Sequence, residues 1–254
     1  MRRDGTPIRT IVETGTLRHL PQYPPYYLPY YLTAQAAGAG VLLGWLAVSA
    51  SSSSHLSLQL WAGLSAGILH RLVGDRGRLS DWVTLSRVGV VVSTLVLASV
   101  VEPDLLVVSL IIGAALLMDR LDGVIARREG ATHRGATLDM ESDQLVVLSM
   151  AAFAVAAHSH PRWILLLPAF KYLDYWVRLA MALPAGEPKP NPAGNRRARI
   201  VCAITMASLW CSAAPVFGDT VASSLSALSV GLLGWSFYED LRWQRLSADG
   251  QARA

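Results

Sequence analysis

Charged residues are scarce in this sequence. They make up 16% of its 254 residues, whereas a soluble domain usually carries about a quarter. Hydrophobic residues make up 52%, and the mean hydropathy is +0.37. This balance argues against an ordinary soluble domain. It indicates an all-α integral membrane protein with several membrane-spanning segments.

Cysteine is also rare. The sequence contains only Cys202 and Cys211, which lie in one apolar stretch. This arrangement offers neither a disulfide framework nor the spacing of a zinc site. A signal peptide is not expected at the N-terminus, because Arg2 and Arg3 precede polar sequence rather than a compact apolar core. No internal repeat is evident.

Eight apolar stretches approach the roughly 20 residues that a transmembrane helix needs. They span residues 31–50, 58–73, 83–100, 105–126, 138–157, 163–183, 200–216 and 221–237. The connections between them are short and contain glycine, proline or serine. We therefore predict about eight transmembrane helices.

Lysine and arginine gather in every second connection and at both ends of the chain. They occur before the first stretch, after the second, fourth and sixth, and in the tail, whereas the other connections hold only Arg162. Cytoplasmic loops of membrane proteins carry such an excess. The pattern predicts a multi-pass protein of the cell membrane with cytoplasmic termini. It also accounts for the net charge of +4, so no nucleic-acid partner is expected.

Two pairs of aspartates flank the predicted cytoplasmic turn between the fourth and fifth stretches. Asp119 and Asp122 are three residues apart, and Asp139 and Asp143 are four apart, so each pair shares one helix face. The short turn makes the helices antiparallel neighbours, and the two pairs can converge. Four close carboxylates repel one another unless cations bind, and their hard oxygens suit Mg²⁺ or Mn²⁺. Two such ions about 4 Å apart are a known device for phosphoryl chemistry.

Small residues accompany the aspartates. Gly123 and Ala126 follow the first pair, and Gly135 precedes the second, leaving room for a backbone or a flat ligand to approach. Arg127 lies at the predicted membrane surface, where its guanidinium could hold a diphosphate.

The combined pattern, D-x-x-D-G-x-x-A-R followed by G-x-x-x-D-x-x-x-D, resembles the signature of the CDP-alcohol phosphotransferases, integral-membrane enzymes of phospholipid synthesis. The matching residues are Asp119, Asp122, Gly123, Ala126, Arg127, Gly135, Asp139 and Asp143. Thr84 and Arg87 also match a Thr-x-x-Arg of the family, although the Pro-Asn that often precedes it is absent here. The turn from Arg127 to Gly135 holds seven residues, where the family more often has eight.

The resemblance covers about residues 83–240 and implies a fold. The family core has six helices, which the last six stretches would form after an added N-terminal pair. We expect a cytoplasmic N-terminal segment (1–30), the added pair and its loop (31–80), a catalytic core (81–240) and a cytoplasmic tail (241–254). Family members are commonly homodimers, so a second copy is an expected partner.

The resemblance also implies a reaction. An alcohol attacks the lipid-side phosphate of a CDP-linked lipid such as CDP-diacylglycerol, and CMP leaves. By analogy Asp119, Asp122 and Asp139 hold two Mg²⁺ or Mn²⁺ ions, with Asp143 close to them and acting as general base. The implied CDP-binding residues are Thr84, Asp122, Gly123, Ala126, Arg127 and Gly135. The residues alone do not separate ligand from base among the four carboxylates.

Many members of the family use a phosphorylated acceptor, such as glycerol 3-phosphate or inositol phosphate. Candidates for the anion pocket that such an acceptor needs are Lys171, Arg178, Arg196, Arg197 and Arg199. Lys171, Asp174 and Arg178 share one helix face and could instead form an internal ion pair. The three later arginines could instead bind membrane lipid head groups. Glu141 points about 160° away from the Asp139 and Asp143 face, so we leave it out of the site.

Three other interpretations remain open. Intramembrane prenyltransferases also use Asp-rich motifs, but theirs lie far apart in sequence, whereas Asp122 and Asp139 are 17 residues apart. Ion or proton transporters also carry intramembrane carboxylates, usually with repeats and with sites near the midplane. A catalytically lapsed member of the family would retain the same signature.

Overall fold

The described part of the chain consists of helices and their short connections. The computed structural model describes residues 27–49, 52–73, 77–101, 104–130, 133–157, 160–180 and 192–252. The helices are α1 (Tyr27–Ser49), α2 (Ser52–Val73), α3 (Leu79–Val100), α4 (Leu105–Glu129), α5 (His133–Ala157), the 3-10 helix η2 (Arg162–Leu165), α6 (Leu166–Ala180), α7 (Pro192–Ala213) and α8 (Asp219–Ala252). The chain divides into two units, Met1–Ala34 and Gln35–Ala254. All contacts discussed below lie within the second unit.

Each predicted apolar stretch overlaps one of these α-helices, but several helices extend beyond it. Helix α7 begins at Pro192, eight residues before the predicted stretch, and α8 continues to Ala252, fifteen residues past it. Hydropathy detects only the apolar part of a helix. The polar ends form the same backbone hydrogen bonds, and pairs such as Glu239 and Arg242, three residues apart and 3.8 Å from each other, are compatible with a helix.

Local contacts explain where α3 begins and where α4 begins and ends. The Asp81 carboxylate accepts a hydrogen bond from the backbone N–H of Arg78 at 3.1 Å, which satisfies a donor at the start of α3. Asp104 caps α4 by accepting from the N–H of Leu106 at 2.8 Å. Helix α4 ends at Glu129, and Gly130 follows it with a φ of 86°, a backbone conformation that favours glycine.

The beginning of α3 is attached to the end of α4. The Arg78 guanidinium donates to the carbonyls of Glu129, at 3.2 Å, and Gly130. The Ser80 hydroxyl donates to the Glu129 carboxylate at 2.8 Å, and chiefly this bond lowers the pKa of Glu129 below its usual value. These contacts fix the last turns of α4 against α3.

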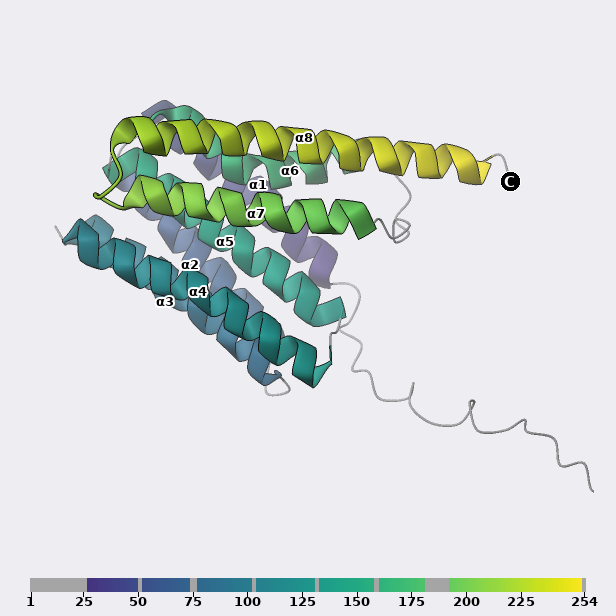
Figure 1. Cartoon of the computed structure of the whole chain (residues 1–254), viewed down its shortest axis with the longest axis horizontal. Coiled ribbons are helices and arrows are strands. Elements are labelled where there is room, and N and C mark those ends of the chain that lie inside the picture. Colours follow the sequence, from purple (N-terminus) through teal and green to yellow (C-terminus); the bar gives the residue numbers. More distant parts are fainter. Residues whose placement is uncertain are drawn as a thin grey trace, which may run out of the picture. The chain divides into compact units, whose positions relative to one another are not determined.

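Helix α5 is the most enclosed helix of the Gln35–Ala254 unit. It packs against α2, α3, α6 and α7, while α7 runs along α8 (Figure 1). Every residue from 145 to 155 is buried. Small side chains at Ala151, Ala152 and Ala154 let neighbouring helices approach closely. The residues before Leu145, including Asp139 and Asp143, therefore occupy the N-terminal half of a helix that its neighbours hold in place.

Polar contacts attach α1 and α2 to the later helices. The buried Gln59 amide of α2 donates to the backbone carbonyl of Ser149 in α5 at 2.8 Å. The Arg162 guanidinium in η2 donates to the carbonyls of Ala47 and Val48 at 3.0 and 3.2 Å. Carbonyls at the end of a helix have no partner within that helix, so Arg162 satisfies those of α1.

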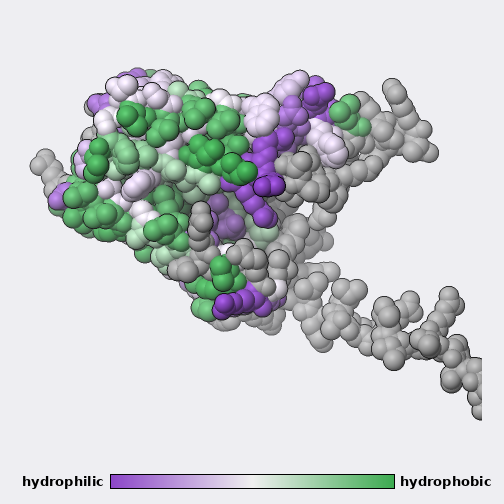
Figure 2. Space-filling view, in the orientation of Figure 1, coloured by the Kyte–Doolittle hydropathy of each residue, from purple (hydrophilic) through white to green (hydrophobic). Residues whose placement is uncertain are grey.

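Large apolar side chains point outward from many helices. Leu110, Leu117 and Leu228 are 61%, 69% and 54% exposed. In Figure 2 apolar side chains cover much of the visible face, and hydrophilic ones gather toward the end where α7 begins. Within the described residues, Leu79–Val100 and Asp219–Trp243 are long and apolar enough to cross a membrane. These features indicate membrane association, and the count of eight spans stays a prediction.

A close approach of α1 and α2 gives a test of the packing. A Cβ atom added at Gly38 would overlap the Trp61 ring at Cζ2, whereas one at Gly40 would meet nothing within 4 Å. The Trp61 indole also donates to Gln35 at 2.8 Å, so the ring cannot move without losing that bond. We expect Gly38→Ala to destabilise the protein by about 1–3 kcal/mol.

The control for this prediction lies on the same helix. Gly40→Ala gains the same helix propensity, about 1 kcal/mol, without the clash, and should be neutral or stabilising. Thermal unfolding of the two purified variants in detergent, measured by tryptophan fluorescence, compares them directly. Equal melting temperatures for the two would contradict the packing of Trp61 on Gly38.

Candidate active site

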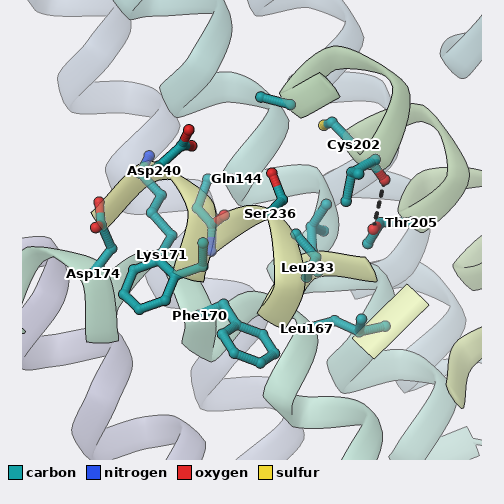
Figure 3. A pocket seen from close by; sticks show the side chains of 14 residues that line it. Gln144, Leu167, Phe170, Lys171, Asp174, Cys202, Thr205, Leu233, Ser236 and Asp240 are labelled. Carbon is teal, nitrogen blue, oxygen red and sulfur yellow. Dashed lines mark hydrogen bonds between the residues drawn. The ribbon is translucent and has the colours of Figure 1, made fainter. Parts of the chain in front are cut away.

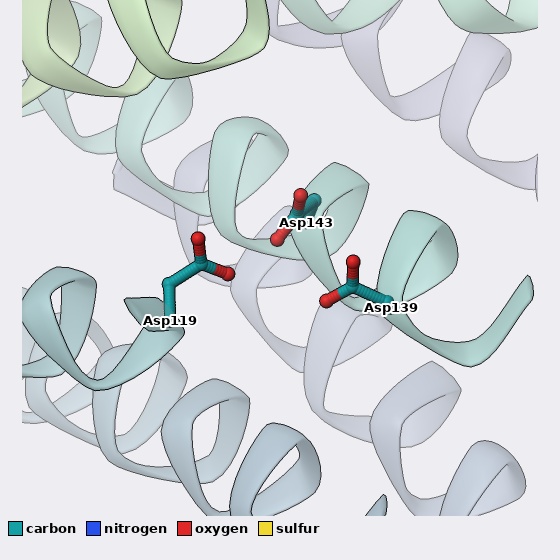
Figure 4. A group of neighbouring side chains, drawn as sticks. All are labelled: Asp119, Asp139 and Asp143. Carbon is teal, nitrogen blue, oxygen red and sulfur yellow. The ribbon is translucent and has the colours of Figure 1, made fainter. Parts of the chain in front are cut away.

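Three carboxylates from two helices converge on one small volume. Asp119 comes from α4, and Asp139 and Asp143 come from successive turns of α5 (Figure 4). One oxygen of each lies within 4.8 Å of those of the other two. Their side chains are 44%, 51% and 21% exposed, so Asp143 is the deepest. The expected convergence of the two helices is present for these three residues, which lie about two to three turns inside α4 and α5.

A buried arginine occupies the centre of this group. Arg87 of α3 is fully buried, and one of its terminal nitrogens lies 2.6 Å from Oδ1 of Asp143 and 3.7 Å from Oδ1 of Asp139. Its other terminal nitrogen donates to Asp119. From the sequence, Arg87 belongs to an apolar stretch and to the Thr-x-x-Arg match, and it is not predicted to be part of the site. A single arginine inside α3 was the available signal, because such a residue usually faces a protein interior.

The residues predicted to bind CDP fall into two groups: those whose side chains the structure describes and those whose side chains it does not. The Thr84 hydroxyl is buried and donates to the Ser80 carbonyl one turn earlier at 3.1 Å. Gly123 and Gly135 are half-buried near the ends of α4 and α5. The side chains of Asp122, Ala126 and Arg127 lie outside the described part of the structure, as does that of Arg178, an acceptor-phosphate candidate.

Lys171, another of those candidates, is engaged by a carboxylate. Its ammonium lies 2.7 Å from Oε1 of Glu141, whose side chain is only 4% exposed. Glu141 therefore faces α6 rather than the aspartate cluster. The rotation of about 100° per residue along a helix correctly predicts that Glu141 faces away from the cluster. That rotation does not predict its partner, Lys171.

The three arginines of α7 differ in their surroundings. Arg196 and Arg199 are exposed. Arg197 lies 2.6 Å from Oδ1 of Asp240 in α8, donates to the Ser236 carbonyl at 3.3 Å, and stacks 5.3 Å from the centre of the Trp235 ring. The structure thus brings Arg197 into an interhelical contact and leaves the other two at the surface.

A cavity of about 200 Å³ opens beside the carboxylates, between α5, α6, α7 and α8 (Figure 3). Its lining residues are Gln144, Val147, Leu167, Phe170, Lys171, Asp174, Ala198, Val201, Cys202, Thr205, Leu233, Ser236, Phe237 and Asp240. Cys202 connects the cavity to the cluster, because its Sγ lies 3.8 Å from Oδ2 of Asp143.

The carboxylate cluster fits a divalent cation. Carboxylate oxygens are the ligands that Mg²⁺ and Mn²⁺ prefer, and three of them lie within 4.8 Å of one another. Arg87 offers one positive charge against three carboxylates. These four side chains therefore carry an excess of negative charge that a bound cation would offset.

The chain matches a known protein family. The model of the CDP-alcohol phosphatidyltransferase family matches residues 78–235. The chain belongs to this family, which confirms the resemblance seen in its signature. Membership makes it a transferase of phospholipid synthesis that in general takes a CDP-linked donor and an alcohol acceptor. Comparisons with curated proteins and with solved structures found no match.

Proposed function

We propose that this protein transfers a phosphatidyl group from CDP-diacylglycerol to an alcohol and releases CMP. The observation that carries the proposal is the convergence of Asp119, Asp139 and Asp143 within the matched residues 78–235. A cluster of carboxylates beside a cavity suits a reaction in which an alcohol loses a proton and a nucleotide leaves. The family match over residues 78–235 favours a transferase over an ion transporter.

Each carboxylate has a proposed role. Asp119, Asp122 and Asp139 would hold two Mg²⁺ or Mn²⁺ ions, with Asp143 also close to them. When bound, such ions neutralise the diphosphate and stabilise the departing CMP. Asp143 accepts the proton of the alcohol as general base, and it contacts Cys202, which lines the cavity. Arg87 positions it through the 2.6 Å contact.

The donor and the membrane arrangement complete the proposal. Thr84, Gly123, Ala126, Arg127 and Gly135 border the CDP moiety together with Asp122. Eight helices cross the cell membrane, of which the last six form the catalytic core, and both termini and the α4–α5 turn face the cytoplasm. The exposed Arg196 and Arg199 are well placed to bind anionic head groups at that face. A homodimer is the expected assembly.

Removal of divalent cations is the first test. We expect EDTA to abolish CMP release from CDP-diacylglycerol by the purified protein, and added Mn²⁺ or Mg²⁺ to restore it. The carboxylates and the diphosphate are both negatively charged, so the diphosphate can bind beside them only when cations are present. The amount of CMP released with an acceptor, measured by chromatography, provides the readout. CMP release that continues unchanged in EDTA would refute the metal-dependent mechanism.

A further inference from the structure

We propose that the acceptor alcohol carries no phosphate group and that it binds in the cavity between α5, α6, α7 and α8. This inference rests on the proposed function and specifies its acceptor. It departs from the expectation of a phosphorylated acceptor, which was based on the number of lysine and arginine residues in α6 and α7. The structure places two described members of that set, Lys171 and Arg197, against carboxylates and leaves Arg196 and Arg199 exposed.

The cavity is placed to deliver a hydroxyl to the proposed base. Cys202, at one end of the cavity, lies 3.8 Å from Oδ2 of Asp143. Lys171, Asp174 and Asp240 gather at the other end (Figure 3). An alcohol that extends along the cavity would present its hydroxyl near Asp143 and its remaining groups to the charged end. The volume of about 200 Å³ is below the roughly 300–1,000 Å³ of drug-sized sites, so the ligand is small.

The charge at that end does not suit a phosphate. Of the charged side chains that line the cavity, Lys171 is the one cation among the described residues, and Asp174 and Asp240 are carboxylates. The Lys171 ammonium is bound to Glu141 at 2.7 Å, and the Glu141 side chain is almost completely buried. A phosphate that drew Lys171 away would leave a buried carboxylate without its partner, which is strongly unfavourable.

The arginines of α7 do not supply the missing charge. Arg197 is held by Asp240, by the Ser236 carbonyl and by the Trp235 ring, and its guanidinium is not part of the cavity lining. Arg196 and Arg199 are exposed and lie outside that lining as well. Among the described side chains, the two cations nearest the charged end, Lys171 and Arg197, are therefore each already bound to a carboxylate, which disfavours a dianionic phosphate there.

The remaining lining suits an alcohol with hydroxyl or amino groups. Gln144, Thr205 and Ser236 provide polar groups, and Leu167, Phe170 and Leu233 form apolar walls. Apolar walls with a few polar groups are typical of small-molecule sites. An amino group would also be compatible with the carboxylates at the charged end.

Matched pairs of alcohols test the inference. CMP release by the purified protein would be measured with CDP-diacylglycerol and Mn²⁺, using glycerol and glycerol 3-phosphate, inositol and inositol phosphate, and serine and phosphoserine. We expect the unphosphorylated member of the productive pair to have a kcat/KM at least about tenfold higher. A preference for the phosphorylated member would overturn this inference and leave the proposed function intact. No CMP with any of the six would overturn the proposed function, and this inference with it.

A charge variant adds a second test. Glu141→Gln releases Lys171 from its partner, and we expect the rate with the phosphorylated alcohol, relative to the unphosphorylated one, to rise about tenfold. Glu239→Gln removes a carboxylate elsewhere on α8 and should leave that ratio unchanged. A ratio in Glu141→Gln equal to that of the natural protein would count against the role of this ion pair in excluding phosphate.

Binding can be tested without turnover, with sulfate as a phosphate-like probe. Sulfate stabilises folded proteins in general because it is excluded from their surface, so Lys171→Met serves as the reference. We expect sodium sulfate to raise the melting temperature of the natural protein no more than that of Lys171→Met, and to raise that of Glu141→Gln further. A sulfate-specific stabilisation of the natural protein that disappears in Lys171→Met would overturn the inference.

Discussion

Asp143→Asn is expected to lower the rate of CMP release by about a hundredfold to ten-thousandfold, the usual contribution of a general base. Asparagine cannot accept the proton of the alcohol. Its amide oxygen can still accept a hydrogen bond from Arg87, which now lies 2.6 Å from the Asp143 carboxylate, so the fold should be retained. The measurement is CMP release at saturating CDP-diacylglycerol and Mn²⁺, with Glu239→Gln as a control that loses a carboxylate outside the cluster.

Varying the Mn²⁺ concentration separates the base from the metal ligands. Asp119→Asn and Asp139→Asn each remove one proposed ligand oxygen, so their activity should recover in part as Mn²⁺ is raised. Asp143→Asn should not recover, because excess cation does not replace the proton acceptor. Recovery of Asp143→Asn to the level of the other two variants would assign Asp143 to metal binding alone.

Arg87→Met is expected to destabilise the metal-free protein by about 3–5 kcal/mol, the usual cost of removing one partner of a buried ion pair. Arg87 is fully buried and contacts Asp119, Asp139 and Asp143, so its loss leaves three neighbouring carboxylates without their shared cation. The loss should be smaller with Mn²⁺, since bound cations then offset the same charges. Thermal unfolding in EDTA and in Mn²⁺ measures both effects.

Two further variants make this prediction specific. Arg87→Lys keeps the charge but loses the forked geometry that reaches several carboxylates at once, so its destabilisation in EDTA should be intermediate. Combining Arg87→Met with Asp143→Asn should cost less than the sum of the two single changes, because the residues interact directly. An Arg87→Met protein that melts at the natural temperature in EDTA would show that Arg87 does not neutralise the cluster.

Periodicity predicted the carboxylate cluster because its geometry is mostly local. Asp139 and Asp143 are one turn apart on the same helix, and a short turn returns the chain to Asp119. The helix spacing also placed Glu141 on another face of α5. These features depend on the spacing of residues that are close in the sequence, so they can be predicted from it.

The charge partners could not be predicted in this way because they join helices far apart in the chain. Lys171 and Glu141 are 30 residues apart, and Arg197 and Asp240 are 43 apart. Which faces of α5, α6, α7 and α8 meet depends on packing, which a helical period does not define. The number of basic residues in α6 and α7 therefore suggests an anion pocket. In the structure, however, Lys171 is bound to Glu141 of α5 and Arg197 to Asp240 of α8.

The position of Arg87 in the chain also has a consequence for biosynthesis. Its partners Asp119 and Asp143 follow 32 and 56 residues later. At typical translation rates the ribosome needs about 3–11 s to synthesise the longer interval. During that time α3, an apolar helix long enough to cross a membrane, carries an arginine whose carboxylates have not yet been made. Stable insertion of α3 is therefore expected to wait for α4 and α5, so that the three helices leave the translocation machinery together.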